Sequence, residues 1–233
     1  MTATSPAEAI PPFLRKIRGV ILDLDGTLYN QKQLRSTMRR KLIGFYLFRP
    51  WLIKELILLV RFRRLREELA EAGEGGVALQ QYAVTARKCN CSSAEVERVV
   101  ERWMHQAPLP HLAGCRYPFV DNLLSLLSKQ QIMAAVLSDY PPEAKLKALG
   151  LDHLLSCSST DPGIDRLKPD PAGLLYICRR WNLSPDQCLV IGDRDERDGE
   201  AARRAGMPYL VVPDGLNFSS MDQLLQESSP NRG

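Results

Sequence analysis

The chain has 233 residues, a length that accommodates one α/β domain with an inserted subdomain. Its 45% hydrophobic and 25% charged residues are typical of a soluble globular protein, and a net charge of +4 is too small to indicate a nucleic-acid partner. Residues 1–14 show no signal-peptide pattern and are expected to be a flexible leader. The six cysteines form no zinc-binding or redox pattern, so a cytoplasmic location is expected.

The stretch 20–29 is the centre of the predicted fold. Its apolar start predicts a strand buried on both faces, with Asp23 near the strand's end and Asp25 just beyond it. Because residues i and i+2 of a strand point to the same side, both carboxylates are expected to address one point. Mg²⁺ would relieve their repulsion, since it accepts one or two carboxylates together with phosphate oxygens. Taken alone, the stretch also fits a strand that runs into an Asp-Gly turn.

Residues 31–112 have a helical pattern and are expected to form an all-helical insert. The helices are predicted at 33–48, 50–72, 78–89 and 93–106. Two proline-bearing stretches then lead back into alternating strands and helices.

The charge of this insert is unevenly distributed. Between Arg35 and Arg66 there are ten Lys or Arg residues and a single acid, Glu55, together with several aromatic residues. The favoured interpretation is a solvated basic face. Two alternatives remain: cations that attract a substrate with more negative charge than one phosphate, and weak contact with anionic lipid. A transmembrane span is not expected, because Arg49, Lys54 and Glu55 interrupt the apolar run.

The rest of the chain alternates between strands and helices. Strands are predicted at 18–24, 132–137, 154–159, 187–192 and 207–212, and helices at 117–130, 142–149, 172–181, 199–205 and 220–227. This alternation predicts an α/β fold with a doubly wound parallel sheet and right-handed crossovers. In such sheets the site forms at the carboxyl ends of the strands, where Asp23, Asp25, Ser138 and Asp193 all fall.

Three of the polar positions that follow the insert have alternative explanations. Ser138 and Asp139 end a strand, but they also suit the cap of the helix that follows. Lys168 precedes Pro169 and could be a solvated lysine before a turn. Asp193 follows a buried apolar strand directly, which a charged loop alone does not explain.

These motifs resemble those of the haloacid dehalogenase-like (HAD) hydrolases, over about residues 17–215. Asp23-Leu-Asp25-Gly26-Thr-Leu resembles the first motif, and three further motifs follow in the family's order, at Ser138, at Lys168-Pro169 and at Gly192-Asp193 with Asp198. In the fourth motif, Asp195 competes with Asp198 as the second acid. The resemblance implies a Rossmann-like core formed by residues 15–30 and 113–233, with residues 31–112 as a helical cap.

The resemblance further implies a Mg²⁺-dependent phosphatase that hydrolyses a small phosphomonoester, a substrate that could bear extra negative charge, through an aspartyl-phosphate intermediate. The catalytic roles implied are nucleophile for Asp23, general acid and base for Asp25, and stabilisation of charge on the nucleophile and the phosphoryl group for Lys168. Phosphate contacts are implied for Ser138, Asp139, Lys168 and Gly26, and metal binding for Asp23, Asp25 and Asp193, with Asp198 in the outer shell.

Other functions stay open on this fold. Dehalogenases of the family lack the second aspartate of the first motif, so Asp25 argues against that activity. A phosphomutase keeps all four motifs and stays an alternative, as does a non-catalytic binding or membrane-surface protein.

Overall fold

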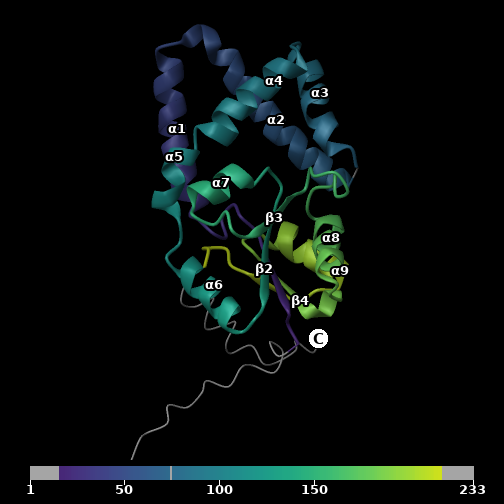
Figure 1. Ribbon diagram of the computed structural model, residues 1–233. Helices are drawn as coiled ribbons and strands as arrows, with labels where there is room; N and C mark the ends of the chain where they lie inside the picture. The colour runs from purple at the N-terminus through teal and green to yellow at the C-terminus, as the bar shows by residue number, and fades with distance from the viewer. Residues whose placement is uncertain (1–15, 74, 217–233) are drawn as a thin grey trace, which may run out of the picture.

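The computed structural model describes residues 16–73 and 75–216, and its core is a five-stranded parallel sheet of order β3-β2-β1-β4-β5 (Figure 1). The strands are β1 (Gly19–Leu22), β2 (Met133–Ser138), β3 (Leu155–Ser158), β4 (Cys188–Gly192) and β5 (Tyr209–Val211). The predicted doubly wound sheet is confirmed. The predicted leader and the predicted helix 220–227 lie outside the described residues.

The central strand β1 is buried on both faces, as its apolar sequence predicts. Val20 and Leu22 pack in one core cluster with the buried face of α6 (Phe119–Lys129). Ile21 points the other way, into a cluster with α8 (Ala172–Trp181) and α9 (Glu200–Ala205). Helices therefore cover both faces of the sheet, α6 on one side and α8 and α9 on the other (Figure 1).

The helical insert lies over the carboxyl ends of the strands (Figure 1). Its elements are α1 (Gln31–Leu47), a 3₁₀ turn (Pro50–Leu52), α2 (Ile53–Ala72), α3 (Val77–Cys89), α4 (Ser93–Val100), a π-helical turn (Glu101–Gln106) and α5 (Leu109–Leu112). We call this insert the cap. Two predicted helices are thus not α-helical throughout: the one at 50–72 begins as a 3₁₀ turn, and the one at 93–106 ends as a π-helical turn.

Local capping explains where two cap helices begin. The Asn30 side chain accepts a hydrogen bond from the Gln33 amide (2.9 Å) at the start of α1. Ser92 accepts one from the Glu95 amide (3.1 Å) at the start of α4. In the described ranges, no helix combines the length and the apolar character needed to cross a membrane.

The cap and the core are connected by specific polar contacts. The carboxylate of Asp165, a core residue, accepts hydrogen bonds from the amides of Gly76 (2.8 Å) and Ala78 (3.0 Å), at the start of α3. Arg197 of the core pairs with Glu67 of α2. These contacts hold the cap over the end of the sheet where polar side chains gather.

Candidate active site

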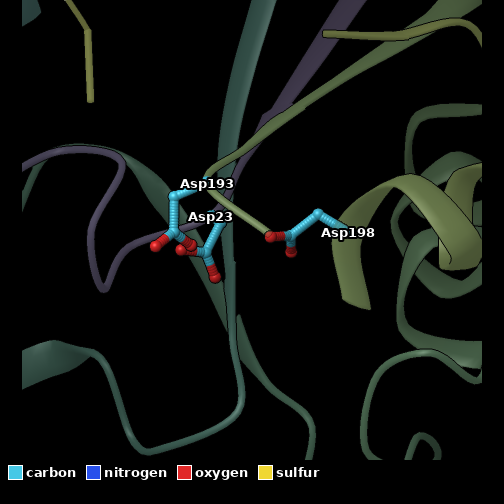
Figure 2. A group of neighbouring side chains, drawn as sticks. All are labelled: Asp23, Asp193 and Asp198. Atoms are coloured by element: carbon cyan, nitrogen blue, oxygen red, sulfur yellow. The ribbon is translucent and has the colours of Figure 1, made fainter. Parts of the chain in front are cut away.

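Three carboxylates converge at the carboxyl edge of the sheet (Figure 2). Asp23 follows β1 and Asp193 follows β4, and these strands are direct neighbours in the sheet. Asp198 comes from the π-helical turn Asp195–Gly199. One oxygen of each carboxylate lies within 4.8 Å of the others.

A buried lysine joins two of these acids. The Lys168 ammonium lies 2.5 Å from Oδ1 of Asp23 and 2.6 Å from Oδ1 of Asp198. Burial would lower the pKa of Lys168, but the charges of Asp198 and Asp23 outweigh burial and raise it well above its usual range. Lys168 is therefore a permanent cation beside Asp23.

One lysine does not balance three acids. Burial raises the pKa of Asp23 well above its usual range, with Lys168 opposing and Asp198 and Asp193 adding to the shift. Burial and the charge of Asp198 also raise the pKa of Asp193, to about 6. The positive charge of Lys168 is thus too small for this group of acids, and their all-oxygen donor set is the kind that Mg²⁺ prefers. These residues fit the expected metal.

The Asp25 carboxylate lies apart from this group. It accepts hydrogen bonds from the Lys145 ammonium, at 2.6 and 2.9 Å, and from the Tyr29 hydroxyl. Burial would raise the pKa of Asp25, but Lys145 and Tyr29 outweigh it and lower the pKa. The sequence predicted a strand to residue 24, whereas β1 ends at Leu22, so the i, i+2 rule no longer aligns Asp25 with Asp23.

The sequence did not predict Lys145. It lies on α7 (Glu143–Ala148), the helix that follows β2, and it is buried. Its position near the start of a helix that follows a strand was the one signal in the sequence. Helix periodicity could have placed Lys145 on the buried face of that helix.

Two of the predicted phosphate-binding residues, Ser138 and Asp139, lie at the carboxyl end of β2. Ser138 ends β2, and its hydroxyl accepts a hydrogen bond from the Tyr140 amide (3.2 Å). The Asp139 carboxylate accepts hydrogen bonds from the Ser159 hydroxyl (2.8 Å) and the Lys168 amide (3.2 Å), which positions the Lys168 backbone.

Gly26 is needed for the close approach of Asp193. A Cβ atom at residue 26 would lie 2.2 Å from Oδ2 of Asp193, and the backbone φ of +111° also favours glycine. Its role is therefore to leave room for a carboxylate.

The structure separates the two candidates for the second acid of the fourth motif. Asp195 is exposed and pairs with Arg203, at 3.0 Å. Asp198 is buried, contacts Lys168 and belongs to the group of three carboxylates. Asp198, predicted for the outer shell, thus has a carboxylate oxygen within 4.8 Å of one oxygen each of Asp23 and Asp193.

A cavity of about 200 Å³ lies between the cap and the core. Its wall includes Arg66 of α2, which is buried and donates hydrogen bonds to the Gln81 side chain and the Asp139 carbonyl. Its guanidinium also lies 4.1 Å from the centre of the Tyr140 ring. These partners are all neutral, and Arg66 forms no ion pair with any residue that the structure describes.

A second polar group reaches the wall of this cavity. His105 places Nδ1 2.9 Å from a Glu101 carboxylate oxygen, while its buried Nε2 has no hydrogen-bond partner among the described residues. Arg66 and His105 are both cap residues. The cavity therefore combines a buried cation with an unused imidazole nitrogen.

Comparisons with known proteins agree with the motifs and the fold. Residues 17–206 match the family model of the haloacid dehalogenase-like hydrolases. A phosphoglycolate phosphatase of Haemophilus influenzae is 28% identical over 219 residues, 90% of each chain. A glyceraldehyde 3-phosphate phosphatase of Methanopyrus kandleri is 25% identical over 92% of this chain and 91% of its own.

Solved structures share the fold. A 2-haloacid dehalogenase of Pseudomonas syringae superposes with a TM-score of 0.62 at 21% identity, over 91% of this chain and 100% of its own. A magnesium-bound HAD hydrolase of Bacillus subtilis also reaches 0.62, at 16% identity, over 90% of this chain and 98% of its own. The resemblance seen in the sequence is confirmed: the chain belongs to the haloacid dehalogenase-like hydrolases.

Proposed function

We propose that the chain is a Mg²⁺-dependent phosphatase that hydrolyses a small phosphomonoester through an aspartyl-phosphate on Asp23. The observation that supports this most is the contact between Asp23 and the Lys168 ammonium, at 2.5 Å, beside Asp193 and Asp198. The phosphatase activities of the relatives in Haemophilus influenzae and Methanopyrus kandleri agree with it.

In the first step, a carboxylate oxygen of Asp23 attacks phosphorus, and the bond to the leaving alkoxide breaks. Asp25 supplies the proton that this alkoxide takes up. In the second step, Asp25 accepts a proton from the water that attacks the aspartyl-phosphate. Lys145 favours the ionised form of Asp25, which this second step requires.

Charge on the transferring group is neutralised from several sides. Lys168 lies beside Asp23 as a buried cation, and the Ser138 hydroxyl at the end of β2 is a donor for a phosphoryl oxygen. Asp23, Asp193 and Asp198 would hold Mg²⁺. When bound, Mg²⁺ would neutralise and orient the phosphoryl oxygens.

The cavity under the cap supports a substrate with a second anionic group. Arg66 is a buried guanidinium with neutral partners only, and a buried charge without a counter-ion is costly. A substrate carboxylate or second phosphate in the cavity would supply that counter-ion. Phosphoglycolate, which names the activity of the Haemophilus influenzae relative, combines a phosphate with a carboxylate. Arg66 thus supports the interpretation that cations of the basic segment attract a substrate with more negative charge than one phosphate.

The state of the cysteines is compatible with the proposed cytoplasmic location. All six are free thiols in the structure. Cys178 and Cys188 are buried with their sulfur atoms 3.3 Å apart and yet do not form a disulfide. A reducing compartment suits this arrangement.

The test is phosphate release from a panel of phosphomonoesters, with Mg²⁺ or with EDTA. The variants are Asp23→Asn and, as a matched control, Asp195→Asn, which alters an exposed acid of the neighbouring loop. We expect Mg²⁺-dependent phosphate release from the wild type. Asp23→Asn should abolish this release, and Asp195→Asn should keep it within about twofold of the wild-type rate. Release that survives Asp23→Asn would contradict the proposal. A folded, Mg²⁺-binding protein that releases no phosphate but becomes phosphorylated would point to a phosphomutase.

A further inference from the structure

The connection between α1 and α2 exposes large apolar side chains. We call the following set the α1–α2 patch: Ile43, Leu47, Phe48, Trp51, Ile53, Ile57 and Val60. Phe48 is 75% exposed and Trp51 71% exposed. Only three other large hydrophobic residues of the described ranges are exposed, and they are dispersed over α3, β2 and β5. Such a concentration of exposed apolar residues marks an interaction surface.

The patch residues of each helix share one face of that helix. Ile43 and Leu47 are four residues apart on α1, and Ile53, Ile57 and Val60 follow the i, i+4, i+7 spacing on α2. The buried residues of α2, such as Leu58 and Phe62, occupy a different face, where they pack into the cap. The patch is therefore not a part of the core that is poorly covered.

The segment that carries this patch has exposed cations and no exposed acid between Arg35 and Arg66. Exposed lysine and arginine side chains lie close to it in the sequence: Arg39, Arg40 and Lys41 on α1, Arg49 between the helices and Lys54 on α2. None of these five forms an ion pair within residues 16–73 and 75–216. Glu55, the one acid between Arg35 and Arg66, is buried and accepts hydrogen bonds from Tyr46 (3.2 Å) and Arg98 (3.3 Å). The exposed surface is consequently both apolar and positive.

We propose that the α1–α2 patch docks this protein on the surface of an anionic lipid bilayer. Trp51, Phe48 and the aliphatic side chains would enter the headgroup region, and the cations of the same segment would contact lipid phosphates. A second copy of the chain fits less well, because a two-fold contact would place unpaired cations of both copies against each other. Charge complementarity thus selects the membrane.

The position of the patch allows docking without blocking the site. The α1–α2 connection lies at the end of the cap farthest from the sheet (Figure 1). The cavity is lined by residues of both the cap and the core, and the carboxylates lie at the edge of the sheet. The docking proposal therefore stands whether or not the proposed phosphatase activity is correct, and its tests do not use activity.

The first experiment is co-sedimentation of the full chain with vesicles of phosphatidylcholine alone or of phosphatidylcholine with phosphatidylglycerol. We expect binding to the anionic vesicles about tenfold tighter or more, weakened by added salt. Trp51 also serves as a fluorescent reporter, because Trp103 is buried and Trp181 is partly buried. Its emission should shift to shorter wavelength only with the anionic vesicles.

Paired variants separate the patch from the general surface. The patch variants are Leu47→Ala with Phe48→Ala, and Arg40→Glu with Lys54→Glu. The matched controls are Leu79→Ala, an apolar residue 82% exposed on α3, and Lys129→Glu, an exposed lysine at the end of α6. All these side chains are exposed, so circular dichroism should show an unchanged fold. We expect each patch variant to lose at least about tenfold in vesicle binding and each control to keep it.

Three results would overturn the proposal. The first is no binding of the wild-type chain to anionic vesicles. The second is equal binding by the patch variants and their controls. The third is a dimer in light scattering without vesicles that Leu47→Ala with Phe48→Ala dissociates, since the patch would then bind a second copy.

Discussion

The ammonium group of Lys145 lies 2.6 Å and 2.9 Å from the two carboxylate oxygens of Asp25, and both side chains are largely buried. This ion pair separates the two aspartates of the first motif into different roles. Asp23 is placed with Lys168 and the other acids of the site, whereas Asp25 has a cation of its own. Two carboxyl groups in distinct environments are what a nucleophile and an acid–base group require.

Replacing Lys145 should change the pH dependence of turnover. Lys145→Met removes the cation that lowers the pKa of Asp25, so that pKa rises. Because the second step needs ionised Asp25, the acidic limb of the kcat profile should move to higher pH by about 1 unit or more. Lys147→Met, on the exposed side of the same helix, is the control. Identical limbs in both variants would refute this role for Lys145.

Replacing Gly26 should weaken metal binding. In Gly26→Ala, the new Cβ meets Oδ2 of Asp193 at 2.2 Å, and the positive φ adds backbone strain. We expect the Mg²⁺ concentration for half-maximal activity to rise by about tenfold or more. Gly114→Ala, where a Cβ meets nothing within 4 Å, should leave it unchanged. Equal metal dependence in the two variants would show that Asp193 need not approach this closely.

The stability of the metal-free protein should depend on pH through Asp193. Its folded-state pKa of about 6 exceeds the unfolded value of about 3.9, so the folded state binds this proton more tightly. The contribution of Asp193 to the free energy of unfolding is therefore largest below about pH 4 and is lost as pH rises to about 6.

Thermal unfolding in EDTA, compared between wild type and Asp193→Asn, measures this contribution. The Tm of the wild type should fall more steeply from about pH 4 to 6 than that of the variant. Mg²⁺ should raise the wild-type Tm more at pH 7 than at pH 5, because protons compete with the metal for Asp193. Parallel curves for the two proteins would exclude a raised pKa at this residue.

Replacing Arg66 should affect only substrates with a second anionic group. Arg66→Leu removes the buried guanidinium of the cavity, so kcat/KM for phosphoglycolate should fall by at least about tenfold. The kcat/KM for ethyl phosphate, which has no second anionic group, should change little. Arg64→Leu, an exposed position on the same helix, is the control. An equal loss with both substrates would mean that Arg66 acts through the fold and not by substrate contact.

The parts of the fold that depend on buried strands could be predicted from the sequence. Apolar runs such as those before Asp23 and Asp193 specify strands, and parallel pairing brings their carboxyl ends to one edge. Each predicted strand overlaps an observed one, with ends that differ by at most two residues. The positions of Ser138, Asp193 and Asp23 at that edge follow from this pattern.

What the sequence could not determine depends on how helices are oriented. Lys145 meets Asp25 because of the way α7 packs against the loop after β1, a contact between residues 120 positions apart. Arg66 belongs to a run of cations, and only the packing of α2 shows that it faces the cavity while Lys54 faces solvent. Helix periodicity in an insert with two apolar faces does not decide which face is buried.

The most direct test of the central claim, that Asp23 is the nucleophile, is to trap the covalent intermediate. The enzyme is quenched during turnover, reduced with borohydride, which converts an aspartyl-phosphate into homoserine, and digested for mass spectrometry. The account predicts homoserine at residue 23, dependent on substrate and on Mg²⁺. Modification at residue 25 instead, or an unmodified residue 23 in an enzyme trapped during active turnover, would contradict it.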